Sequence, residues 1–261
     1  MTQTISRPVG ELLREWREQR RLSQLELSSR AEISTRHLSF VETGRSAPSR
    51  AMVLHLTEEL DVPLRERNRL LLAAGYAPVY GETGLDQPRM AAIRAAVGQV
   101  LAGHEPYPAV VVDRAWQLVD RNASAGLLIS SVAPELLQPP VNVLRVSLHP
   151  NGMAPRIVNL GEWRAHLLAQ LRRQVAVTAD PRLAELYTEL EGYPGGDEPG
   201  PSDASGVIVP LRLRHDGGEL AFFSTVATFG TPLDVTVAEL AIESFFPADA
   251  HTAAVLRGTA D

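Results

Sequence analysis

Two successive helix starts lie close together near the beginning of the chain. Ser23 and Glu26 have the spacing of a capping box, in which the serine hydroxyl and the glutamate carboxylate each accept a hydrogen bond from a backbone N–H group. Ser34 is a second N-cap residue, and Leu38 and Val41 follow it at the i, i+3 spacing of one buried helix face. The sequence therefore predicts two short helices joined by a turn of about three or four residues.

Further helices are predicted on both sides of this pair. Apolar residues recur with the helical period in three more segments, which are Val9 to about Arg20, Ser49 to Leu60, and Leu64 to Ala74. Gly44 and Gly75 follow predicted helices directly, at the position where the backbone often turns left-handed. The first part of the chain is therefore expected to be an all-α domain.

The second part of the chain changes its hydrophobic period. A link over 76–87 leads to an amphipathic helix from Arg89 to Gly103, and a helical region around 163–190 lies between strand patterns. The predicted strands are Pro108–Asp113, Trp116–Asp120, Val207–Arg214, Glu219–Thr228 and about Asp234–Phe245. This order predicts an α+β domain with an antiparallel sheet of about five strands and helices on one face.

Composition narrows the classes of function. The chain has no cysteine, which excludes disulfides, thiolate metal sites and a cysteine nucleophile. Residues 1–80 have a net charge of +2 and residues 81–261 a net charge of −8, so only the first part suits a polyanionic partner. No apolar run approaches the length of about 18 residues that spans a bilayer, and the first residues lack the apolar core of a signal peptide. We expect a cytoplasmic protein that does not bind membranes.

The spacing of the two short helices resembles the phage-repressor-like, or XRE, helix-turn-helix family over about residues 9–62. The residues that carry the resemblance are Ser23-Gln24, Leu27-Ser28, Ala31, Ser34, Leu38, Val41-Glu42 and Gly44. The resemblance implies an N-terminal helix-turn-helix domain that binds double-stranded operator DNA with the second short helix in the major groove. A small residue is needed where the two helices cross, and Ser28 provides it.

The resemblance also implies which side chains contact DNA. The candidates are Gln24, Ser34, Thr35, Arg36, His37, Ser39, Phe40, Arg45, Ser46 and Arg50. Gln24 is expected at a phosphate, together with the helix N-terminus, and Arg36 at a guanine edge. Four of these residues have alternative interpretations. Arg36 can be an ordinary surface arginine and His37 a solvent-exposed bystander. Phe40 can pack into its own domain, and Arg50 can cap a helix instead of contacting a phosphate. Glu42 is expected to form a structural ion pair with Arg17.

Glu32 departs from the family pattern. Glycine is common at this position, because the backbone of the turn tends to be left-handed there. A non-glycine residue in that conformation costs about 1–2 kcal/mol. The departure therefore predicts local strain at Glu32 and leaves the helix-turn-helix assignment unchanged.

A second resemblance extends over nearly the whole chain. Residues 39–50, 62–68, 71–78, 111–122 and 245–249 look like the MmyB-like (MltR-type) regulators. The resemblance implies a PAS-like ligand-binding and dimerisation domain at 105–261, after a DNA-binding domain at 1–78 and a linker with a connecting helix at 79–104. The implied effector is a small apolar or fatty-acid-like molecule that modulates operator binding.

A pocket between sheet and inserted helices is the natural place for such an effector. The candidate lining residues are Trp116, Trp163, His166, Leu167, Leu171, Phe223 and Phe229. Each of them can alternatively be an ordinary core residue, and His166 can be structural or exposed.

Two other functions are alternatives to this one. An enzyme is disfavoured, because the chain lacks the nucleophile-elbow, zinc-protease, phosphate-loop and dinucleotide-binding motifs. We predict no catalytic residues, no metal and no cofactor. The other alternative is a DNA-binding regulator whose C-terminal domain only dimerises or docks a protein partner. In both regulator readings the protein is expected to act as a homodimer, because one repressor-like domain reads only a half-site.

Overall fold

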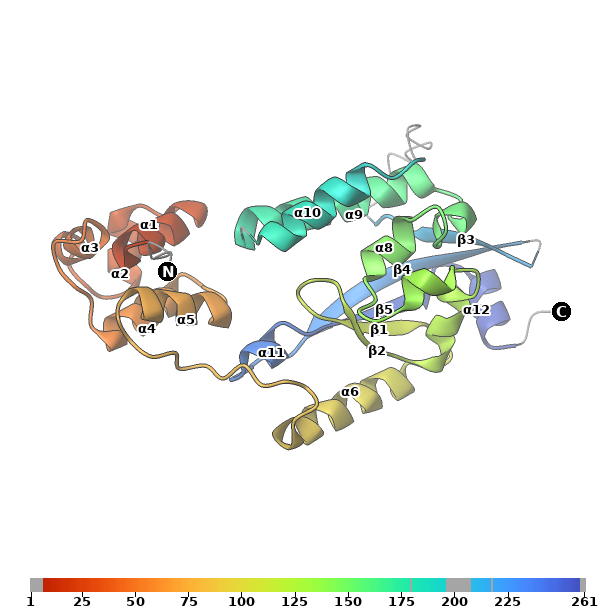
Figure 1. The fold of residues 1–261 in the computed structure, drawn as a ribbon, viewed down its shortest axis with the longest axis horizontal. Helices are drawn as coiled ribbons and strands as arrows, with labels where there is room; N and C mark the ends of the chain where they lie inside the picture. Colours follow the sequence, from red (N-terminus) through yellow and green to blue (C-terminus); the bar gives the residue numbers. More distant parts are fainter. Residues whose placement is uncertain (1–6, 179, 196–207, 217, 259–261) are drawn as a thin grey trace. The chain divides into compact units, whose positions relative to one another are not determined.

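The computed structural model describes residues 7–178, 180–195, 208–216 and 218–258. These residues belong to two compact units (Figure 1). The first unit contains residues 1–84 together with 231–238, and the second contains 85–230 and 239–261. Within the described residues, no helix has the length and apolarity needed to cross a membrane.

Residues 7–84 of the first unit form five helices that follow one another closely. They are α1 (Val9–Gln19), α2 (Gln24–Arg30), α3 (Thr35–Glu42), α4 (Arg50–Glu59) and α5 (Leu64–Ala73). Their core contains Leu13, Leu27, Leu38 and Leu56, all nearly inaccessible to solvent. The capping box at Ser23 and the N-cap at Ser34 are both present, so the predicted all-α domain and its two short helices are confirmed.

Two close approaches position α3 within this unit. Gly10 of α1 lies against the end of α3, and a Cβ atom on it would stand 2.3 Å from the carbonyl oxygen of Val41. On the other side, the Ser28 hydroxyl of α2 lies 2.9 Å from the Leu25 carbonyl oxygen and 2.8 Å from the Thr35 hydroxyl. Small residues at these two positions allow α1 to approach the end of α3 and α2 to approach its start.

The second unit contains a five-stranded sheet in which every pairing is antiparallel. The strands are β1 (Ala109–Val112), β2 (Leu118–Arg121), β3 (Leu211–His215), β4 (Gly218–Thr228) and β5 (Ala241–Pro247), in the order β2-β1-β5-β4-β3. The helices are α6 (Ala91–Gly103), α7 (Gly126–Ile129), α8 (Val143–Leu148), α9 (Leu160–Thr178), α10 (Pro181–Glu191) and α12 (Ala250–Leu256). This fold confirms the predicted PAS-like α+β class. Val207, the start of one predicted strand, lies outside the described residues.

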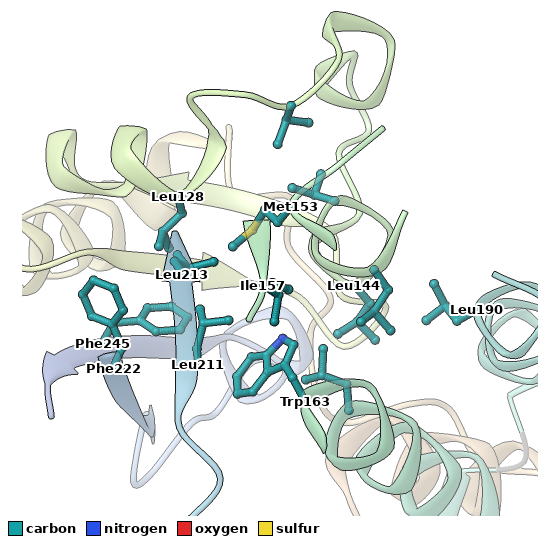
Figure 2. Close-up of a cluster of buried hydrophobic side chains, with 14 of the residues drawn as sticks. Leu128, Leu144, Met153, Ile157, Trp163, Leu190, Leu211, Leu213, Phe222 and Phe245 are labelled. Carbon is teal, nitrogen blue, oxygen red and sulfur yellow. The ribbon is translucent and has the colours of Figure 1, made fainter. Parts of the chain in front are cut away.

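Helices cover both faces of the sheet (Figure 1). On one face α6 packs Val97 and Leu101 against Ala109, Val111 and Ile242, so the predicted connecting helix is part of this unit's own core. The opposite face, together with α8, α9 and α10, encloses the larger hydrophobic core. Figure 2 shows that core, with Leu211, Phe222 and Phe245 from the strands and Leu144 and Trp163 from the helices.

The segment between β4 and β5 differs from the prediction of one continuous strand from Asp234. Residues 235–238 form a short helix, α11 (Val235–Ala238), and belong to the first unit. The Asp234 carboxylate accepts hydrogen bonds from the backbone N–H of Thr236 at 2.9 Å and from the Thr83 hydroxyl at 2.5 Å. The Val235 N–H donates to the carbonyl of Gly81 at 2.8 Å. Asp234 therefore starts a helix where β-branched residues suggested a strand.

Candidate DNA-binding face and effector pocket

Helix α3 has one buried side and one accessible side. Leu38, Val41 and Glu42 are buried, whereas Arg36 is exposed and Phe40 is half-buried. The Ser34 hydroxyl accepts a hydrogen bond from the His37 N–H at 3.2 Å and so caps the first turn. The N-terminal half of α3 is thus available to a partner, and its accessible side has a positive charge.

Arg36, Phe40 and Arg45 form a cluster on this accessible side. The two guanidinium carbons lie 5.3 Å and 5.8 Å from the centroid of the Phe40 ring. Cations at these distances interact favourably with the negative face of an aromatic ring. The cluster places two arginines, one within α3 and one just after it, around a half-buried ring that limits their motion.

Behind α3, a buried ion pair ties it to α1 and α2. Arg17 donates from Nε and Nη2 to the two carboxylate oxygens of Glu42, at 2.7 Å and 2.9 Å. Only 9% of the Arg17 side chain and 1% of the Glu42 side chain remain accessible. Gln24 also donates to Glu42, at 2.8 Å from Nε2. The predicted Arg17–Glu42 ion pair is therefore confirmed, and the amide N–H of Gln24 is directed to this pair.

The other residues predicted at DNA occupy varied positions. Thr35 is half-buried, and its hydroxyl contacts Ser28. Ser34 is exposed, and His37, Ser39 and Ser46 are half-buried. Arg50 is exposed at the first position of α4, directly after the N-cap Ser49. All of them lie on α3, on the loop after it, or at the neighbouring helix start.

Each of the helices α1 to α5 is followed by a left-handed residue. Gly44 and Gly75 occupy two of these positions, and Arg21, Glu32 and Asp61 occupy the other three, with φ of 56°, 50° and 48°. At the turn between α2 and α3, Ile33 donates to the Ser28 carbonyl and Glu32 to the Ser29 carbonyl, which is the pattern of a Schellman motif. The predicted left-handed backbone at Glu32 is confirmed.

Glu32→Gly is expected to be neutral or to raise the free energy of unfolding of the first unit by up to about 1 kcal/mol, because glycine avoids the Cβ clash. Gly44→Ala is the matched control. No atom lies within 4 Å of the added methyl group, so its expected loss of about 1 kcal/mol reports backbone strain alone. Amide hydrogen exchange of α2 and α3 measures both effects. A clear loss of protection in Glu32→Gly would contradict the prediction.

The second unit contains a mainly apolar cavity of about 80 Å³ between the sheet and the helices on its larger core. Its lining residues are Val110, Leu118, Arg121, Ala125, Leu128, Ile129, Leu137, Val141, Val143, Leu144, Val146, Ser147, Met153, Trp163, Leu167, Leu211, Glu243 and Phe245. Trp163 donates through Nε1 to the Ser147 hydroxyl at 3.0 Å, so both of these polar groups are partnered. Figure 2 shows several of the lining side chains converging.

Two of the seven candidate lining residues, Trp163 and Leu167, line this cavity. Trp116 instead donates through Nε1 to Gln174 of α9 at 2.7 Å, in a turn where its own backbone has φ of 63°. His166 stacks on Trp163, with 5.7 Å between ring centroids. Burial, and then the charge of Arg173, lower the pKa of His166, which favours the neutral imidazole.

The remaining three candidates do not line the cavity. Leu171 is fully buried within the core but does not reach the cavity. Phe223 pairs with Phe246 across β4 and β5, on the sheet face opposite to Phe245, and the two rings stack at 5.3 Å. Phe229 packs with the cluster beneath α6. Successive residues of a strand point to opposite faces of the sheet, so Phe223 lies on the other face from its neighbour Phe222.

The charged residues of the lining, Arg121 and Glu243, were not among the candidates. Both interrupt otherwise apolar faces of strands, and Glu243 has the same direction as the cavity residue Phe245 two positions later. Alternation along β5 is the sequence signal that could have identified Glu243.

A capped helix pair with an accessible, arginine-bearing second helix defines a helix-turn-helix DNA-binding protein, here joined to a domain with an apolar cavity. Residues 8–70 match the family described as "Helix-turn-helix domain", and residues 93–258 match the family described as "MmyB-like transcription regulator ligand binding domain". The chain belongs to this second family, whose match covers more than half of its length. No curated protein sequence matches the chain. The protein is a DNA-binding transcription regulator with a ligand-binding domain.

Proposed function

We propose that the protein binds a specific operator in double-stranded DNA and that a small molecule in the second unit modulates this binding. The accessible side of α3, with Arg36 and Arg45 around Phe40, is the observation that carries the DNA part of the proposal. Arg36 bonds a guanine edge, and Gln24, Arg45 and Arg50 contact the phosphate backbone. Ser34, Thr35, His37, Ser39, Phe40 and Ser46 complete the contact surface.

The proposed active form is a cytoplasmic homodimer without catalytic activity. A single helix-turn-helix unit reads only a half-site, and useful affinity requires two such units on a two-fold operator. The charge distribution supports DNA contact by the N-terminal part alone, since the net charge of −8 on residues 81–261 disfavours contact of that part with a duplex.

Chain connectivity supports a route for modulation. Residues 231–238 are held in the first unit by hydrogen bonds to Gly81 and Thr83, yet they lie between β4 and β5 of the second unit. Glu243 and Phe245 of β5 line the cavity only a few residues later. A ligand that shifts β5 therefore acts on a segment anchored in the DNA-binding unit. Such a shift changes operator affinity only if the ligand prefers one of two arrangements.

The cavity favours an apolar or fatty-acid-like effector. Binding sites for drug-sized molecules usually measure about 300–1,000 Å³, so a cavity of about 80 Å³ must enlarge to take one. Enlargement requires movement of the lining helices or strands, so the empty and the ligand-bound forms differ in structure. Modulation of DNA binding needs such a difference. The competing proposal, a second unit that only dimerises or docks a partner protein, predicts no such response.

Leu167→Trp is the test that separates these proposals. The added ring volume is expected to fill the cavity, change operator affinity, and abolish the response to an effector, while salt-sensitive DNA binding persists. Fluorescence anisotropy with the protein's own promoter DNA, at several salt concentrations, measures both. Val177→Trp on the accessible side of the same helix is the matched control. Unchanged affinity and response in a folded, dimeric Leu167→Trp would favour the dimerisation proposal. Failure of the wild-type protein to bind its promoter at low salt would overturn the DNA part.

A further inference from the structure

The side of α6 that points away from the sheet is exposed along its whole length. α6 packs on the sheet with Val97 and Leu101, and Ile93 lies partly buried beside them. The exposed residues of the opposite side are Ala91, Ala92, Ala95, Gly98, Gln99, Ala102 and Gly103, which we call the outer face of α6. Val100, at the edge of this face, is 47% exposed. Figure 1 shows α6 on the outside of the second unit.

The outer face of α6 has no charged side chain. Arg94 is the one charged residue of the helix, and its Nη1 donates to the carbonyls of Leu85 and Gln87 in the segment before the helix. By contrast, the exposed residues of α9 and α10 include Arg172, Arg173, Arg182, Glu185 and Glu191. A helix that faces water on one side usually has charged or polar residues there. The composition of this face is therefore that of a contact surface.

Gly98, in the middle of α6, is not required by the fold of its own chain. A Cβ atom added to it would have no atom within 4 Å. Glycine in the interior of a helix is less stable than alanine, because it loses more conformational freedom on folding. A second helix that packs against α6 would give this glycine a role, since the distance between packed helices depends on the side chains at their contact.

Charge indicates which partner suits the outer face of α6. In a two-fold dimer the same patch of each copy meets itself, so a patch with acidic residues would repel its own copy. Residues 81–261 have a net charge of −8, yet of the helices α6, α9 and α10 only α6 has no acidic residue. A basic partner protein would be attracted to the acidic surfaces instead. The outer face of α6 therefore suits a second copy of this chain.

The length of the link before α6 is also compatible with such a dimer. Gly84 is the last residue of the first stretch of the DNA-binding unit, and α6 begins at Ala91. A chain of this length spans at most about 25 Å. Two paired α6 helices thus keep both DNA-binding units within reach of half-sites about 34–36 Å apart.

We propose that the protein dimerises through the outer face of α6, which packs on the same face of a second copy around a two-fold axis. Ala95 and Gln99 lie near that axis, and Gly98 allows the two helix backbones to approach. A helix of 13 residues is about 20 Å long and about 10 Å wide. It supplies only part of the roughly 800 Å² that each partner buries in a stable complex, and the surface beside α6 supplies the rest. The inference rests on the proposed homodimer and adds to it the surface that forms it.

Ala95→Glu tests the interface in the full-length protein. It places two like charges near the two-fold axis and is expected to raise the dissociation constant of the dimer about a hundredfold or more. Glutamate is a good helix former, so α6 itself should still fold, which circular dichroism checks. Ala176→Glu is the matched control, because it makes the same change at an exposed alanine of α9. Sedimentation equilibrium is expected to show an unchanged dimer for this control.

Gly98→Ala separates packing between copies from stability within one copy. In the monomeric Ala95→Glu background, the added methyl group is expected to raise the melting temperature of the second unit by about 2–4 °C. In the wild-type background the same methyl group lies between two packed helices and is expected to weaken the dimer about tenfold. A Gly98→Ala dimer as tight as the wild type would overturn the close approach at Gly98.

The absence of cysteine from the chain allows a direct check of the geometry. Ala95→Cys and Gln99→Cys each introduce one thiol group per copy. A residue beside a two-fold axis lies opposite its own copy, so at least one of these variants is expected to form a disulfide between copies under mild oxidation. Ala176→Cys is expected to form none.

Binding to DNA distinguishes this inference from the proposed function. Ala95→Glu is expected to bind a single half-site duplex as the wild type does and to bind the whole operator more weakly. An equal loss on both duplexes would overturn the assignment of this face to dimerisation. A dimer that persists in Ala95→Glu, with no disulfide at either position, would overturn the α6 interface and leave the proposed homodimer intact. A wild-type protein that stays monomeric with and without operator DNA would overturn both.

Discussion

Glu42→Ala is expected to lower the free energy of unfolding of the first unit by about 3–5 kcal/mol, because it leaves the buried guanidinium of Arg17 without its carboxylate. The substitution removes the acceptor of two hydrogen bonds from Arg17 and one from Gln24. Arg17 keeps its hydrogen bond to the carbonyl of Leu22 and a longer ion pair, of 3.7 Å, with the exposed carboxylate of Glu18. Little of either ionic side chain is accessible, so water cannot replace the lost partner without rearrangement.

The double variant Arg17→Met/Glu42→Leu is the informative control. It removes both charges together, and apolar side chains in place of a buried ion pair are often neutral or stabilising. Most of the lost stability is therefore expected to return. Hydrogen exchange of α1 and α3 at increasing urea measures the first unit within the full chain. A loss below about 1 kcal/mol in Glu42→Ala would mean that the pair is accessible to solvent, as surface pairs are.

Arg36→Ala is expected to weaken operator binding by about 1–3 kcal/mol and to relax base preference at one position of each half-site. The reason lies in its position on the first turn of α3, where its guanidinium is exposed and stacked on Phe40. A phosphate contact would instead be lost equally on every sequence. The loss of base preference is thus the diagnostic part of this prediction.

Competition binding with operator variants and with random DNA separates the two kinds of contact. Gln24→Ala is expected to weaken binding to all sequences alike, although its bond to Glu42 requires that stability be measured in parallel. Arg69→Ala removes another exposed arginine, which lies on α5 and is paired with Glu66, and is expected to leave affinity and base preference unchanged. If Arg36→Ala behaves as Arg69→Ala does, another residue of α3 reads the bases.

The first unit shows how far local signals reach. Ser23 and Ser34 cap the helices that they were predicted to cap, because a cap needs only backbone groups three residues away. The left-handed turn at Glu32 and the Arg17–Glu42 ion pair were also predicted, because the geometry that goes with the helix-turn-helix spacing is known. The interaction of Gln24 with Glu42 did not, because it depends on side-chain rotamers at a three-helix junction.

The second unit shows where local signals fail. The residues that line the cavity are determined by strand register, and register depends on contacts between segments more than a hundred residues apart, such as Val110 and Glu243. Phe223 lies on the sheet face opposite to Phe245, and Phe229 packs with the cluster at α6, so neither large aromatic ring lines the cavity. The charged residues Arg121 and Glu243 line it instead.

The sequence by itself determined the two-part organisation, the capped helix pair and the α+β class with its antiparallel sheet, because caps and hydrophobic periods act over one or two helical turns. Only the tertiary structure decided that residues 231–238 belong to the first unit and that Arg121, Val110 and Glu243 share one row of the sheet. Both results require distant segments to meet. The free energy that stabilises these contacts comes from burial and hydrogen bonds over the whole folded domain. It therefore cannot be predicted from a short stretch of sequence.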